Sequence, residues 1–122
     1  MNFVEHSKER RRCPRLEKNL PLKISCDDFD IVTETKNLSC LGAYCQINKF
    51  LEPLTKLKIV LLLPFKDKKN VLTKKVSCQG VVVRTEAIPS KNNLYNIAIY
   101  FNDIQKKEIN KISEYVNSLL EK

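Results

Sequence analysis

The stretch Val76-Ser-Cys-Gln-Gly-Val-Val-Val83, together with Tyr95-Asn-Ile-Ala-Ile-Tyr-Phe101, decides the fold class of this 122-residue chain. In both segments apolar side chains recur at every second position, which is the period of a β-strand with a buried face. Four earlier runs rich in Val, Ile, Leu, Tyr and Thr complete the set, and strands are expected at 22–26, 31–35, 42–47, 56–63, 71–84 and 94–101. About six short strands without intervening helices predict an antiparallel barrel or sandwich.

The end of the chain has the pattern of an amphipathic helix. Asn102 is predicted to cap this helix, and Gln105 stands at the capping-box spacing. Six apolar residues form one stripe: Ile104, Ile109, Ile112, Val116, Leu119 and Leu120. We expect the stripe to pack against the strands of the same chain. The alternative is that it forms a dimer interface.

The arginines are concentrated near the N-terminus. The chain has 22 Lys and Arg against 14 Asp and Glu, a net charge of +8, yet only five of its cations are Arg. Four of these five, Arg10, Arg11, Arg12 and Arg15, fall within six positions. Pro14 favours an extended or turning backbone, in which Arg11 and Arg15 would point the same way roughly 13 Å apart. Two guanidinium groups at that distance could hold one planar anionic ligand, whereas a solvated basic tail is the alternative.

The composition argues against an enzyme. His6 is the only histidine, and the five cysteines include no C-x-x-C pair, so neither a metal centre nor a disulfide framework is expected. We therefore expect reduced thiols, no catalytic residues and no cofactor. Residues 1–15 are polar where a signal peptide would be apolar, and the longest apolar run, 59–63, is too short to span a bilayer. These features predict a cytoplasmic protein without a membrane span.

A second motif, Asn37-Leu-Ser-Cys-Leu-Gly42, lies between two predicted strands. Asn and Ser side chains bond nearby backbone or an incoming ligand, and Gly adopts the positive φ that other residues resist. Gly42 is one of only two glycines in the chain. Taken alone, the hexapeptide is an ordinary loop, but its combination with the arginine pair is more specific.

The two motifs together resemble the PilZ domains, bacterial receptors for cyclic di-GMP. The family pairs R-x-x-x-R on an N-terminal arm with D/N-x-S-x-x-G on a barrel, and both are intact here as Arg11-Arg-Cys-Pro-Arg15 and Asn37-Leu-Ser-Cys-Leu-Gly42. The resemblance covers essentially the whole chain. It implies one domain over 1–122, with a flexible arm at 1–19, a six-stranded antiparallel, Greek-key-like barrel at 20–101 and a helix at 102–121.

By this resemblance the ligand lies between the arm and the barrel rim. Arg11 and Arg15 would engage phosphate and guanine, while Asn37 and Ser39 would hydrogen-bond a guanine edge or a phosphate. Gly42 would shape the turn. The expected function is that of a cyclic di-GMP receptor whose arm becomes ordered over the ligand and signals to a downstream partner protein.

Two further residues bear on the details of binding. In the family, a basic residue at the position of Arg10 tends to accompany a stacked ligand dimer, so two ligands per chain are expected. Ala98 stands where family members often carry glycine in the last strand.

Two other functions compete with this interpretation. A small basic barrel could bind RNA or single-stranded DNA, although such surfaces usually interleave aromatic rings and Phe3 is the sole aromatic residue of the arm. The chain could also be a PilZ-like adaptor without ligand binding.

Overall fold

The computed structural model describes residues 14–120, apart from the side chain of residue 67. Its elements are β1 (Pro21–Cys26), β2 (Phe29–Leu38), β3 (Gly42–Ile47), β4 (Lys56–Asp67), β5 (Asn70–Ala87), β6 (Tyr95–Asp103) and α2 (Lys106–Leu120). Arg10 and Arg11 lie outside the described residues.

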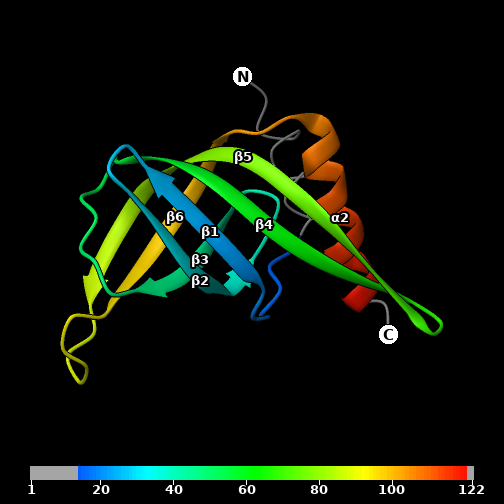
Figure 1. Ribbon diagram of the computed structural model, residues 1–122, viewed down its shortest axis with the longest axis horizontal. Helices are drawn as coiled ribbons and strands as arrows, with labels where there is room; N and C mark the ends of the chain where they lie inside the picture. The colour runs from blue at the N-terminus through cyan, green and yellow to red at the C-terminus, as the bar shows by residue number, and fades with distance from the viewer. Residues whose placement is uncertain (1–13, 121–122) are drawn as a thin grey trace.

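The strands form a closed antiparallel barrel in the order β1-β2-β3-β6-β5-β4 (Figure 1). The chain first forms the meander β1-β2-β3, and β4 then returns to pair with β1. The spatial order 4-1-2-3 of these four strands is that of a Greek key. The predicted mainly β, Greek-key-like barrel with a C-terminal helix is therefore confirmed.

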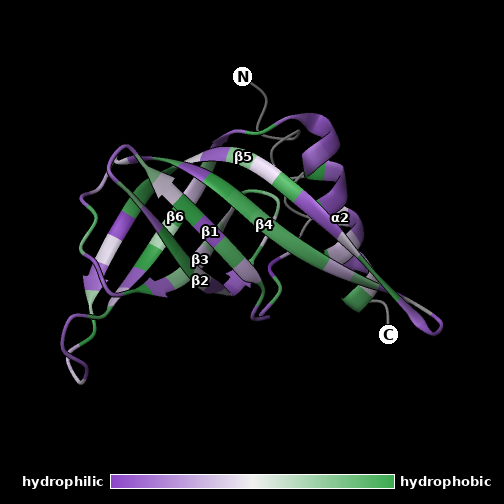
Figure 2. Ribbon diagram, viewed as in Figure 1, coloured by the Kyte–Doolittle hydropathy of each residue, from purple (hydrophilic) through white to green (hydrophobic). Residues whose placement is uncertain are grey.

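The barrel interior is filled by the alternating apolar residues that the sequence pattern predicted. Along β6, Ile97, Ile99 and Phe101 are buried, while Tyr100 between them is exposed. Figure 2 shows the same mixture of hydrophobic and hydrophilic residues along the strands. Each strand therefore contributes one face to the core and leaves the other at the outer surface.

The C-terminal helix packs within the chain, as expected. Ile112 and Val116 are fully buried, and the ring of Tyr115 meets that of Phe65 edge-to-face at a centroid distance of 5.3 Å. Leu120 departs from the predicted stripe, because 49% of its surface is exposed.

The start of this helix differs from the prediction. Asn102 is not its cap but lies in β6, which continues because Asp103 still pairs with Gln79 of β5. The first helical bonds run from the N–H groups of Glu108 and Ile109 to the carbonyl oxygen of Gln105. Strand pairing thus outcompetes the local capping signal.

The β4–β5 hairpin is longer than the sequence predicted. Pro64 was expected to lie beyond the end of a strand, yet β4 runs through it to a two-residue turn at Lys68 and Lys69. Pairing between β1 and β4 ends at Leu61, so Pro64 has no neighbour on that side. A proline is tolerated there because its missing N–H removes no bond to β1.

Candidate functional site

The base of the arginine arm is held against β2. Leu16 and Leu38 form an antiparallel bridge, with N···O distances of 2.8 Å and 2.9 Å in the two directions. Both leucine side chains are buried, whereas Arg15 is exposed and Asn37 is half-buried. Arg15, one position before Leu16, therefore shares the outer face with Asn37 and lies opposite Ser39.

A second contact fixes the arm a few residues further along. The buried Thr35 hydroxyl donates to the carbonyl oxygen of Lys18 at 2.6 Å and accepts from the N–H of Leu20 at 3.0 Å. Leu20 itself is 1% exposed. The described part of the expected flexible arm, residues 14–19, is therefore bonded to β2 at two places.

The second motif begins in β2 with Asn37 and Leu38, turns tightly at residues 39–41, and enters β3 at Gly42. The Ser39 N–H donates to the carbonyl oxygen of Gly42 at 3.0 Å, and the Ser39 hydroxyl accepts from the N–H of Leu41 at 3.1 Å. The Leu41 carbonyl in turn accepts from the N–H of Phe101 in β6. Ser39 is 8% exposed, so its hydroxyl supports the turn from within the structure.

Gly42 is needed for a different reason from the one expected. Its φ is not positive, and the predicted role for a left-handed backbone is wrong. A Cβ built on Gly42 would lie 2.0 Å from the carbonyl oxygen of Ile99, which belongs to the paired backbone of β6. Glycine is required at this position because β3 and β6 approach closely there.

Strand register aligns Asn37 with three residues that are distant in sequence. Asn37 of β2 pairs with Tyr44 of β3, Tyr44 with Ala98 of β6, and Ala98 with Arg84 of β5. This outer row, Asn37–Tyr44–Ala98–Arg84, crosses four strands and spans roughly 14 Å. Ala98, between Tyr44 and Arg84, has the smallest side chain of the row.

The larger side chains of the outer row are linked across Ala98. Arg84 Nη2 donates to the Tyr44 hydroxyl at 2.9 Å, and Arg84 Nε lies 3.9 Å from a carboxylate oxygen of Glu86. The hydrogen bond with Tyr44 and the charge of Glu86 raise the pKa of Arg84, which stays cationic. Sequence reasoning assigned no binding role to Tyr44 or Arg84. Arg84 was the one arginine outside the arm, but its distance from Asn37 follows only from the strand register.

The described thiols are mostly as expected. Cys26, Cys45 and Cys78 are free, whereas Cys40 is disulfide-bonded, so the prediction of reduced thiols is wrong for Cys40. Burial raises the pKa of Cys45 to about 12, which keeps it as an uncharged packing residue.

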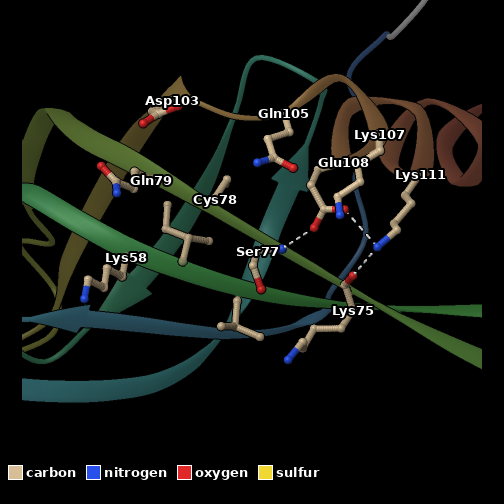
Figure 3. A pocket seen from close by; sticks show the side chains of 12 residues that line it. Lys58, Lys75, Ser77, Cys78, Gln79, Asp103, Gln105, Lys107, Glu108 and Lys111 are labelled. Carbon is tan, nitrogen blue, oxygen red and sulfur yellow. Dashed lines mark hydrogen bonds and ion pairs between the residues drawn. The ribbon is translucent and has the colours of Figure 1, made fainter.

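A separate cavity of about 630 Å³ lies where α2 meets β4 and β5 (Figure 3). Glu108, Lys111, Ser77 and Lys75 are among its lining residues, whereas Arg15 and the motif of residues 37–42 are not. Within residues 14–120, no cluster of three or more potential metal-binding His, Cys, Asp or Glu side chains occurs. No helix among the described residues has the length and apolar character needed to cross a membrane.

The outer face therefore combines a guanidinium group at the arm, an amide at Asn37, and an aromatic ring with a second guanidinium group across the barrel. These groups can bind a flat, anionic molecule that carries hydrogen-bonding edges. This arrangement is the candidate ligand-binding face of the β-barrel.

Comparison with known proteins identifies the class more closely. The PilZ domain family matches residues 9–118, so the chain belongs to that family of cyclic di-GMP receptor and adaptor domains. Among solved structures, the fold is similar to that of the Bacillus subtilis inhibitor of motility (MotI/DgrA), with a TM-score of 0.76 and 19% sequence identity. The match covers 93% of this chain and 53% of that one, so this chain spans about half its length. None of the curated proteins compared with the chain matches it.

Proposed function

We propose that the chain is a cyclic di-GMP receptor that binds its ligand on the outer face of the barrel, between the arm and the outer row. The observation that carries the proposal is the Leu16–Leu38 bridge. It ties the chain next to Arg15 to the end of β2 that carries Asn37 and is followed by Ser39, which supports a site shared by these three residues.

In this proposal Arg15 and Arg11 engage phosphate and guanine, and Asn37 presents its amide to a guanine edge. Ser39 and Gly42 contribute mainly by holding the turn, since the Ser39 hydroxyl is already bonded to Leu41. The ligand neutralises clustered arginine charge, and the arm folds over it. The changed surface then signals to a partner protein. Arg10 stacks on a second base, which gives two ligands per chain.

Calorimetric titration of the full chain with cyclic di-GMP tests the proposal. We expect measurable binding, and we expect Arg15→Ala to abolish it while the melting temperature stays within about 2 °C, because Arg15 is exposed. Lys18→Ala is the matched control, since it removes an exposed cation from the same segment. Undiminished binding by the Arg15 variant would contradict the assignment of the site.

The same titration separates the alternatives. No heat with cyclic di-GMP would identify an adaptor that works through protein contacts alone. Oligonucleotide binding that is steeply salt-dependent and indifferent to cyclic di-GMP would instead identify a nucleic-acid-binding barrel.

A further inference from the structure

The β4–β5 hairpin projects beyond the barrel and past α2 (Figure 1). On one side, β1 pairs with β4 only as far as Leu61. On the other side, β6 pairs with β5 only from Gln79 onward. Residues 65–75, which we name the basic hairpin, therefore pair only between β4 and β5 and not with a third strand.

The basic hairpin concentrates the charge of the described chain. It has five lysines and one aspartate, a net charge of +4, whereas residues 14–120 together carry +6. Four of these lysines are exposed and make no ion pair with any residue in the described range: Lys66, Lys68, Lys69 and Lys75. The tip is accordingly hydrophilic in Figure 2.

Two apolar side chains lie among these lysines and are open to solvent. Val71 is 60% exposed and Leu72 is 59% exposed. Because they are consecutive in β5, they point to opposite faces of the hairpin. Val71 lies directly across from Lys66, so this face combines an apolar group with a cation.

The base of the basic hairpin is braced against the helix. The Lys74 ammonium lies 4.6 Å from the centroid of the Phe65 ring and 3.8 Å from a carboxylate oxygen of Glu114. Phe65 also packs against Tyr115. These contacts fix the base of the hairpin against α2, so the exposed lysines project from an element whose position is defined.

We propose that the basic hairpin docks on the surface of an anionic phospholipid bilayer. Clustered lysines are attracted to anionic headgroups, and exposed aliphatic groups such as Val71 and Leu72 can enter the boundary between headgroup and acyl chain. The long lysine stems let the ammonium groups remain at headgroup level while the apolar residues go deeper. This contact is peripheral and involves none of the residues of the cyclic di-GMP site.

The chemistry of the hairpin favours lipid over nucleic acid. It contains no arginine, and its one aromatic ring, Phe65, is packed against Tyr115, so it offers neither a bidentate fork for phosphate nor an exposed ring for base stacking. Lysines also protect free strand edges from pairing with other chains. That role does not explain the exposed valine and leucine beside them.

Vesicle co-sedimentation of the full chain at 0.1 M NaCl tests the proposal. We expect binding to vesicles of phosphatidylcholine and phosphatidylglycerol in a 7:3 ratio, and none to phosphatidylcholine alone. Each lysine near an anionic surface contributes about a fivefold gain in affinity. Replacing the four exposed lysines of the hairpin by Gln is therefore expected to weaken binding at least about a hundredfold.

The matched control removes the same charge elsewhere. Its four substitutions are Lys36→Gln, Lys56→Gln, Lys91→Gln and Lys106→Gln, all at exposed positions. This variant should lose less than about tenfold. Val71→Ser with Leu72→Ser should lower the binding that persists at 0.5 M NaCl, because that fraction depends on apolar contact. Thermal melts establish that each variant is folded.

Several results would overturn the proposal. Equal losses in the two four-lysine variants would show that only net charge matters. Equal binding to neutral and anionic vesicles would show that the charge of the lipid headgroup does not drive binding. Absence of vesicle binding, with hairpin-dependent binding of RNA or of poly-glutamate instead, would assign the surface to a nucleic acid or to an acidic protein.

Discussion

Replacing Glu108 is expected to destabilise the fold, because its carboxylate bonds the backbone of β5 where that strand has no partner on one side. The Glu108 side chain is 8% exposed, and its Oε1 accepts from the N–H of Ser77 at 2.8 Å. Its Oε2 lies 2.8 Å from Lys111 Nζ, which also donates to the carbonyl oxygen of Lys75 at 2.9 Å (Figure 3). Pairing of β6 with β5 begins at Gln79, so α2 side chains occupy the place of a strand partner at Ser77 and Lys75.

The size of the effect follows from what each substitution removes. Glu108→Ala deletes one hydrogen bond to a charged acceptor and one close ion pair. It should lower the free energy of unfolding by about 2–3 kcal/mol, since such hydrogen bonds contribute about 1.5–3 kcal/mol each and this edge is partly solvated. Glu108→Gln keeps an acceptor for Ser77 and should cost about 1 kcal/mol. Glu114→Gln is the control, because its 3.8 Å ion pair is 66% exposed on the glutamate side and contributes less than about 0.5 kcal/mol.

Acidification should narrow the difference in stability between wild type and Glu108→Gln. Burial raises the pKa of Glu108, but the hydrogen bonds with Lys111 and Ser77 and the positive charges of Lys111 and Lys107 outweigh it. The folded-state pKa is therefore lowered below the ordinary value of 4.5. A lowered pKa contributes stability that is fully present above pH 4.5 and is lost as the pH falls through the folded-state value.

Urea unfolding at pH 7 and at pH 3 provides the measurement. At pH 7 wild type and Glu114→Gln should be the most stable, followed by Glu108→Gln and then by Glu108→Ala. At pH 3 the difference in unfolding free energy between wild type and Glu108→Gln should be smaller. If Glu108→Gln is as stable as Glu114→Gln at pH 7, or if the gap is the same at both pH values, the proposed role of the buried carboxylate is refuted.

Three further outcomes are expected. Gly42→Ala should lower the free energy of unfolding by about 3 kcal/mol in thermal or urea denaturation, because its Cβ would meet backbone. Gly80→Ala should cost less, since its added Cβ meets two side-chain methyl groups first, and the opposite order would contradict this explanation. Arg84→Gln should weaken cyclic di-GMP binding about tenfold in calorimetry. The melting temperature should not change, because the contact of Arg84 with Tyr44 is exposed. Unchanged affinity would show that Arg84 is not part of the site. The Cys45 thiol, with a pKa of about 12, should react with iodoacetamide at pH 8 only upon unfolding, and rapid labelling of the native protein would show that it is accessible.

Local sequence pattern predicted the strands well wherever one face of the strand is buried. The alternation of Ile97, Ile99 and Phe101 corresponds to the inward face of β6, and the predicted bounds of β3 agree with the structure. The pattern failed at element ends. Asn102 has the local signal of a helix cap, and Pro64 that of a strand end, but both lie in strands because a neighbouring strand is available for pairing.

For the candidate site, too, the sequence predicted the residues but not their arrangement in space. Arg15, Asn37, Ser39 and Gly42 were predicted as site residues because the two motifs that contain them resemble those of the PilZ family. Arg10 and Arg11, predicted with them, lie outside the described residues. The placement of Arg15 beside Asn37 depends on a single bridge at Leu16, which no local pattern predicts.

By itself, the sequence determined the strands, the terminal helix, the two motifs and the excess of lysine over arginine, since these depend on side-chain chemistry and on periods of a few residues. The pattern of strands left a barrel and a sandwich both open, and the barrel was implied by the resemblance to the PilZ family. Only the tertiary structure decided that Gly42 is required by the closeness of β6, that Glu108 completes the edge of β5, and that Arg84 reaches Tyr44. The first and third of these depend on the register between strands far apart in the chain, whereas the second depends on how α2 packs against β5. A shift of one residue in the register of β5 would move the Arg84 side chain to the other face of the sheet, away from Tyr44.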